Sequence, residues 1–240
     1  MSTFIASAHT DSASTASLVI TKPAGTADND ILFALLKRSD LANPTGVPSG
    51  WALLGEAETA GFIDFWLYWK LAASEGADYT WSWADVARTG GTIVTYRGGF
   101  NTASPIDVTS NTTYQTSDTI CRAASMTVAA ANSSLFFFGA AHFTVDTLTF
   151  TKPSVPTTDW VEDVDTSDTG SRFGRETCNM TWTGSGATGT MDATMSQTRT
   201  DKHGFAVALN PAAGGDPEGR LIGGKLLHGG LLANHGVLVG

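Results

Sequence analysis

The stretch DILFALLKR (Asp30–Arg38) decides the fold class of this chain, because its apolar residues run without a break from Ile31 to Leu36. A helical turn is the alternative interpretation, but the short run and its charged flanks favour a strand that is buried on both faces. The stretch SLFFFGAA (Ser134–Ala141) is likewise apolar on both faces. Both stretches therefore predict interior strands of a β-structure.

Other stretches alternate in the way that strands do. FIDFWLYWK (Phe62–Lys70) places Phe65 and Leu67 on one face and Trp66 and Tyr68 on the other, because successive strand side chains point in opposite directions. YTWSW and HGFAVAL, further along the chain, alternate in the same way. Gly, Pro and Asn separate these stretches, and helix signals are scarce. The pattern predicts about a dozen short strands.

The predicted fold class is all-β. The economical architecture is an antiparallel two-sheet sandwich of jelly-roll type, with an extended glycine-rich tail at the C-terminus. Residues 1–210 are expected to form the sandwich body, in which abundant Thr suits half-exposed strand surfaces.

The composition excludes several classes of protein. The chain has 240 residues, of which 42% are hydrophobic and 15% charged, so it is not intrinsically disordered. A formal net charge of -9 argues against nucleic-acid binding. The N-terminus lacks a signal-peptide pattern, and no run of about 18 apolar residues predicts a membrane helix. For Cys121 and Cys178, two buried thiols are favoured over one disulfide.

The end of the chain differs from the body. Pro and Gly over 211–219 indicate a linker, and an apolar, glycine-rich tail follows over 220–240. Within it, IGGKLL, HGGLLA and NHGVLV form a six-residue repeat, which is typical of β-helical coils. One coil cannot cover its own core, because repeat units need stacked neighbours. We therefore expect the tail to dock on another subunit; the alternative is a strand that folds back on its own body. The candidate assembly residues are Leu221, Ile222, Leu226, Leu227, Leu231, Leu232, Val237 and Leu238.

Several body motifs, read together, resemble a β-sandwich module of tailed-phage virion proteins and of some bacterial surface proteins. The resemblance covers most of residues 15–210. It implies a β-sandwich fold and a virion context, while its motifs look structural. The motifs are Pro23-Ala24-Gly25 with Asp30, Ser49-Gly50-Trp51, Lys70 with Glu75 and Tyr79, Tyr96-Arg97-Gly98 and Pro105-Ile106-Asp107.

The resemblance and the tail together imply a non-enzymatic structural protein of a tailed-phage virion. A head decoration or cement protein, or a spike component, that docks through its C-terminal tail is favoured. The expected partners are capsid or tail subunits and copies of the chain itself, in a virion assembled in the host cytoplasm. Nucleophile-elbow, phosphate-loop and zinc motifs are missing from the sequence, so we expect no catalytic residue, cofactor or metal ion.

The alternative is a carbohydrate-binding adhesin, or a tail or fibre accessory protein, that recognises host-surface glycans. Aromatic rings beside polar groups can stack on a sugar while its hydroxyls are hydrogen-bonded. The competing interpretation, which is favoured, assigns the same rings to the core. The candidate glycan-binding residues are Trp66, Tyr68, Trp81 and Trp83.

The stretch DWVEDVDTSDTG (Asp159–Gly170) gathers five acidic residues. Such a density of carboxylates could hold Ca²⁺, but the calcium-loop pattern fails, so a solvated acidic loop is favoured. Scattered carboxylates leave a glycan hydrolase as a third hypothesis, since sequence does not show which of them meet in space.

Overall fold

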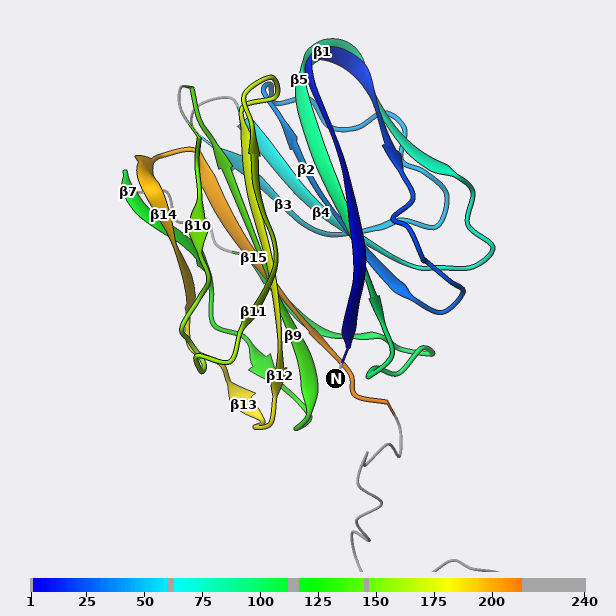
Figure 1. Cartoon of the computed structure of the whole chain (residues 1–240), viewed down its shortest axis with the longest axis vertical. Coiled ribbons are helices and arrows are strands. Elements are labelled where there is room, and N and C mark those ends of the chain that lie inside the picture. Colours follow the sequence, from blue (N-terminus) through cyan, green and yellow to red (C-terminus); the bar gives the residue numbers. More distant parts are fainter. Residues whose placement is uncertain (1, 60–62, 112–116, 145–146, 213–240) are drawn as a thin grey trace, which may run out of the picture.

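The computed structural model describes residues 2–59, 63–111, 117–144 and 147–212. Within these ranges the chain forms 15 strands and no helix, and all strand pairings are antiparallel. Two five-stranded sheets pack face to face, which confirms the predicted all-β sandwich (Figure 1). The predicted linker beyond residue 212 and the tail lie outside the described residues.

The first five-stranded sheet comes from the N-terminal half of the chain and has the order β1-β5-β2-β4-β3. The apolar run of β2 pairs with β4 on one side and with β5 on the other, so it occupies the centre of the sheet. The strands are β1 (Thr3–Thr21), β2 (Ile31–Arg38), β3 (Ala52–Thr59), β4 (Ile63–Leu71) and β5 (Asp78–Arg97).

The second five-stranded sheet comes from the C-terminal half and has the order β11-β12-β9-β15-β6. Its central strand, β9, contains the second apolar run and pairs with β12 and β15. The strands are β6 (Ile106–Asn111), β9 (Ser133–His142), β11 (Val161–Asp168), β12 (Phe173–Trp182) and β15 (Lys202–Leu209).

A three-stranded sheet, β10-β14-β7, covers the outer face of the second sheet. Its strands are β7 (Asp118–Ala123), β10 (Phe150–Thr151) and β14 (Met191–Arg199). The short strands β8 (Thr127–Val128) and β13 (Gly186–Ala187) pair with each other nearby.

Both central strands are buried on both faces, as their sequences predict. Phe33 of β2 and Phe136 of β9 meet in the core between the two large sheets, with ring centroids 5.2 Å apart. Phe137 points the other way, into the core under the three-stranded sheet. Leu32 and Leu36 likewise point outward, into a third core on the outer face of the first sheet. The sandwich therefore has an additional covering layer on each side.

The cover over the first sheet is supplied by β1 and β5 themselves. These strands span 19 and 20 residues, so the expectation of uniformly short strands is wrong here. Gly91 pairs with Thr10, yet a Cβ at Gly91 would lie 2.8 Å from Ile20 and 2.9 Å from Leu18. The far ends of β1 and β5 therefore fold back over their own sheet, and glycine at this position allows the close approach.

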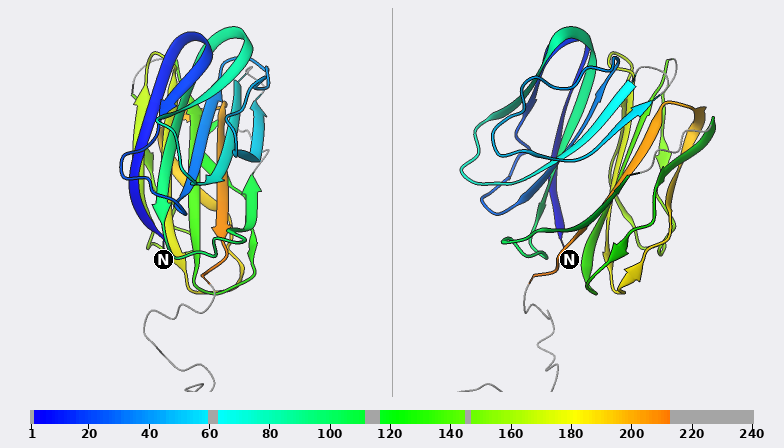
Figure 2. Two further views of the ribbon diagram at one scale, coloured as in Figure 1. Left: turned by 90° about the vertical axis from the view of Figure 1, so that its right-hand side faces the viewer. Right: turned by 180° about the vertical axis from the view of Figure 1, so that it is seen from behind.

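The second half of the chain repeats the topology of the first. In sheet order, β1, β5, β2, β4 and β3 correspond to β6, β15, β9, β12 and β11. The folded-back ends of β1 and β5 correspond to β7 and β14, which form the cover of the second sheet. Each half is thus a small two-layer sandwich, and the two halves pack through their larger sheets (Figure 2).

Details of the strand pairing support this correspondence. One residue bulges out at Ile5 in the β1–β5 ladder, and one bulges out at Asp107 in the β6–β15 ladder. Leu54 and Asp163 occupy matching bulges in the β3–β4 and β11–β12 ladders. Trp residues, at 51 and 160, directly precede β3 and β11. Bulges are specific local features, so their recurrence at matched places argues for one repeated unit.

The packing of the two halves is symmetric as well. Strand β1 contacts β11 and β6 contacts β3, as an approximate two-fold axis through the central core requires. Both ends of the described chain lie at one end of this axis. The Ser2 hydroxyl donates a hydrogen bond to the Gly98 carbonyl (2.9 Å), and Pro211 forms an isolated antiparallel β-bridge with Phe100. We call this the terminal end of the sandwich.

Candidate functional site

The four aromatic side chains considered for glycan binding are buried in the third core. Trp66 is 1% exposed, Tyr68 5%, Trp81 0% and Trp83 4%. They pack on one another and on Trp51, and Arg38 lies over the Trp83 ring at 5.0 Å. No ring face of these residues is open to stack on a sugar. The prediction that these four residues form a glycan-stacking surface is therefore wrong. Their core interpretation fits the burial.

The motifs that carry the family resemblance hold loops together. Asp30 accepts a hydrogen bond from the Ala27 amide (2.8 Å) and forms two bonds of 2.8 Å with the Arg97 guanidinium. Arg97 also donates to the Gly25 carbonyl (2.8 Å). Burial works against the charged carboxyl, but these hydrogen bonds and the Arg97 charge leave the pKa of Asp30 lowered overall. These motif residues therefore fix the turn before β2.

A second motif network joins β4 to β5. The Lys70 ammonium and the Tyr79 hydroxyl both donate to the Glu75 carboxylate, at 2.8 Å and 2.9 Å. The Trp51 ring meets the Tyr79 ring edge-on at 5.1 Å. Both networks are structural, as the residue types suggest.

The acidic stretch after residue 158 is wrongly interpreted as a solvated loop, because most of it forms β11. Asp163 accepts hydrogen bonds of 2.7 Å from the Tyr96 hydroxyl and from the Asn179 amide. Asp165 accepts one from the Phe150 amide (3.1 Å). Among the described residues no group of three or more His, Cys, Asp or Glu could hold a metal ion.

The structure also describes the two cysteines. Cys121 and Cys178 are free, buried thiols on the two sides of the core under the three-stranded sheet. The candidate assembly residues of the tail all lie beyond residue 212, outside the described part of the chain. In that described part no helix is long and apolar enough to cross a membrane.

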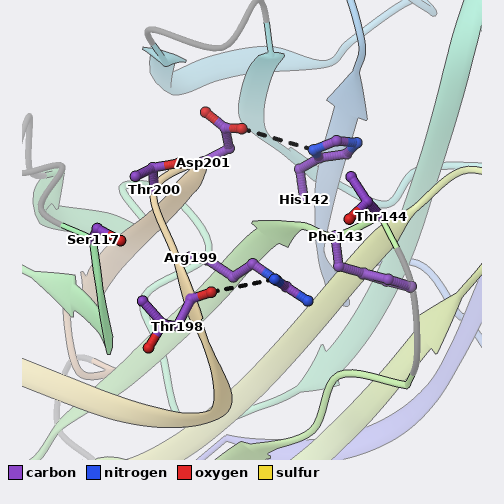
Figure 3. A pocket seen from close by; sticks show the side chains of 8 residues that line it. All are labelled: Ser117, His142, Phe143, Thr144, Thr198, Arg199, Thr200 and Asp201. Carbon is purple, nitrogen blue, oxygen red and sulfur yellow. Dashed lines mark hydrogen bonds and ion pairs between the residues drawn. The ribbon is translucent and has the colours of Figure 1, made fainter.

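The described residues form two surface pockets at the end of the sandwich opposite the terminal end, where β2 and β9 finish. We call this the pocket end. The smaller pocket has a volume of about 190 Å³ and is lined by polar side chains around Arg199 and Asp201 (Figure 3). The larger has a volume of about 430 Å³ and is lined by Ser39, Asp40, Ile63, Val86, Ala87, Arg88, His142 and Arg172. His142 lines both pockets and lies 3.8 Å from the Asp201 carboxylate.

The two pockets occupy equivalent positions in the two halves. The Ser39 amide donates to the Arg88 carbonyl (2.9 Å), and the His142 amide donates to the Asp201 carbonyl (2.8 Å). In each half, this hydrogen bond joins the end of the central strand, β2 or β9, to the residue that precedes the paired part of the adjacent strand, β5 or β15. The same backbone frame therefore carries Arg88 in one half and Asp201 in the other.

The larger pocket is rich in basic groups that lack a carboxylate partner. Arg88 donates only to the Gly170 carbonyl (2.6 Å), and the Arg172 side chain makes no hydrogen bond or ion pair with the described residues. Asp40, on the pocket wall, is held by Arg38 at 2.6 Å. The apolar side chains of Ile63 and Val86 complete the wall.

Lys37 lies behind this pocket, fully buried. Its ammonium donates to the Ser39 hydroxyl and to the Ser171 carbonyl (2.8 Å). Burial, together with the positive charges of Arg88 and Arg172, lowers the pKa of Lys37 to about 7. The charges of Arg88 and Arg172 therefore raise the cost of charging Lys37.

Sequence reasoning missed this site. Its residues come from five separated segments, and only the packing of the two halves brings Arg172 to the end of β2. One usable signal was the isolated Lys37-Arg38 pair that closes an apolar run, because charged residues at the end of a buried strand must find partners.

Comparisons of the chain with models of protein families, with curated proteins and with solved structures found no match.

Proposed function

We propose that this chain is a non-enzymatic structural protein of a tailed-phage virion, a head decoration or cement protein or a spike component. It docks through its C-terminal tail on capsid or tail subunits, or on copies of itself, during assembly in the host cytoplasm. The observation that supports this proposal most is the placement of the chain ends. Pro211 leaves the sandwich beside Phe100 at the terminal end, while the pockets lie at the opposite end. A tether at one end leaves the other end free.

The nature of the body agrees with such a role. Both large sheets are covered on both faces, and each half has its own core in addition to the shared one. Sheets that are covered on both faces bury most of the large apolar side chains of the described residues, which suits a rigid module. We further propose that the strand connections within each half are of jelly-roll type, an architecture common among viral capsid domains.

The test is deletion of residues 220–240, followed by measurement of the copies that particles incorporate. We expect the shortened chain to fold and to be lost from the particle. A matched control replaces only His228 by Ser, which keeps the Gly and Leu repeat. Normal incorporation of the shortened chain would show that the tail does not form the docking surface.

A glycan-binding adhesin is the second candidate, and the pocket pair favours it. The pockets present hydroxyl, imidazole, carboxylate and guanidinium groups at the end away from the tail. Such groups can bind sugar hydroxyls without the buried aromatic rings. A glycan array tests this candidate: binding that is lost on substitution of Arg199 or Arg172 supports it, and an array without any binding opposes it.

A further inference from the structure

The charge balance of the larger pocket is unusual for a chain with a formal net charge of -9. Among the described residues, no carboxylate lies within ion-pair distance of Lys37, Arg88 or Arg172. The nearest acidic group on the inner side, Asp11, is engaged by the buried Arg175. A buried cation without a counter-charge is costly, which is why the pKa of Lys37 is lowered, and the guanidinium groups of Arg88 and Arg172 remain available to an anion.

The backbone presents Arg172 to the pocket in a specific way. Its φ of 57° is in the left-handed region, which is uncommon for a residue with a side chain. The turn is held by the Ser171 amide on Asp168 (2.8 Å) and by the Phe143 amide on the Arg172 carbonyl (3.3 Å). Residues kept in such a conformation cluster at binding sites, where a strained backbone positions a side chain.

The equivalent pocket of the other half provides an internal comparison. Where the larger pocket has Arg88, the smaller one has Asp201, which faces His142. The two halves share one backbone frame, so the framework does not require an uncompensated cation at this position. The smaller pocket has one arginine, Arg199, which donates to Gln197 and to the Thr198 carbonyl, whereas the larger pocket brings together Arg88 and Arg172.

We propose that the larger pocket binds an oxyanion, the carboxylate, sulfate or phosphate group of a small ligand or of a glycan, between Arg88 and Arg172. Guanidinium groups bind such anions through paired hydrogen bonds. Ile63 and Val86 contact the apolar part of the molecule that carries the anion, and Lys37 supplies further positive charge from behind Ser39. The site does not depend on the tail, so it stands or falls separately from the docking proposal.

The direct test is calorimetric titration of the full chain with sodium sulfate, sodium phosphate and sodium acetate at constant ionic strength. Sodium glucuronate, with glucose as its neutral counterpart, distinguishes an acidic sugar from a free anion. We expect saturable binding of at least one oxyanion and none of glucose. An absence of saturable binding of all four anions would overturn the proposal.

Arg172→Gly is the informative variant, because glycine adopts the left-handed backbone without strain and the fold should persist. We expect anion affinity to fall at least tenfold while the melting temperature without anion stays equal or rises. Lys22→Ala is the control, since it removes one positive charge on the surface near the terminal end. Equal losses of affinity in both variants would show that the anion responds only to the overall charge of the protein, and would contradict a specific site at the larger pocket.

A pH series gives an independent readout. Arg88, Arg172, Asp11 and Asp201 set the field at Lys37, whose pKa of about 7 should rise when an anion enters. Binding should then take up a proton near pH 7, and affinity should fall as pH rises beyond it, by up to about tenfold per pH unit. Lys37→Met should abolish this slope; a slope that survives in Lys37→Met would remove Lys37 from the site.

Discussion

At the scale of single residues, the structure explains why aromatic side chains that look suited to sugar binding are core residues. Trp66 of β4 points away from the central core because Phe65 and Leu67 on either side point into it. The folded-back ends of β1 and β5 then cover it. Alternation in the sequence identifies the two faces correctly, but it does not reveal that the outer face is covered.

The burial of Trp66 leads to the first stability prediction. Trp66→Ala should lower the free energy of unfolding by about 3–5 kcal/mol, because it opens a large cavity in the third core. Urea unfolding followed by fluorescence measures the change. Val19→Ala, an exposed apolar residue on the neighbouring β1, is the control and should cost far less. A stable Trp66→Ala protein with altered glycan binding would contradict the core assignment.

Glu176 offers a pH prediction. Its carboxyl is buried, accepts a bond from the Cys178 thiol (3.2 Å), and has one oxygen without a hydrogen-bond partner. Burial raises the pKa of Glu176 to about 8. The native state therefore holds a proton that the unfolded chain releases above about pH 4.5, so this group lowers stability as pH rises from about 4.5 to 8.

Glu176→Gln keeps the shape of the side chain and removes this titration. Its stability relative to the wild type should increase by up to about 1.4 kcal/mol per pH unit over that window. Denaturant midpoints at pH 5, 6, 7 and 8 measure the difference, in which the other titrating groups cancel. A difference that stays constant with pH would show that Glu176 is ionised in the folded protein.

At the scale of elements, the two covers depend on glycines that occupy equivalent places. A Cβ at Gly91 would lie 2.6 Å from Leu36, whose side chain can shift. A Cβ at Gly204 would instead overlap the backbone of Arg122, which cannot move without displacing β7. In both halves the covering strands thus approach the large sheet closely at a glycine. The two positions differ in how well they tolerate an added methyl group.

The difference predicts an order of stabilities. Gly91→Ala should cost about 1–3 kcal/mol through overpacking, and Gly204→Ala should cost more. Gly76→Ala is the control, because nothing lies within 4 Å of the added methyl group. Thermal unfolding ranks the three variants, and a Gly204→Ala protein as stable as the Gly76→Ala control would contradict the close packing of β7 on β15.

How much the sequence predicts differs between elements. The central strands, the facing of β4 and β15 and the all-β class follow from apolar runs and alternation. The first half of β1, rich in Ser, Thr and Ala, carries no such pattern, because it lies at a sheet edge and is only partly buried. The repeat is hidden because equivalent positions share packing roles rather than residue types, as Leu54 and Asp163 show.

At the scale of the whole molecule, the two proposed functions belong to opposite ends of the approximate two-fold axis. The larger pocket lies where both halves meet, and its cations come from both, with Arg88 on β5 and Arg172 before β12. No single stretch of sequence predicts such a site, since the packing of two sheets creates it. The tail prediction, in contrast, depends on the composition and the six-residue repeat of one short stretch of sequence, and it concerns the opposite end.

Docking of the tail on another subunit is tested by hydrogen exchange, measured by mass spectrometry on the free chain and on the assembled particle. We predict rapid exchange over 220–240 in the free chain, strong protection of the same residues in the particle, and little change in the central strands β2 and β9. Protection of 220–240 already present in a free monomer would contradict the account.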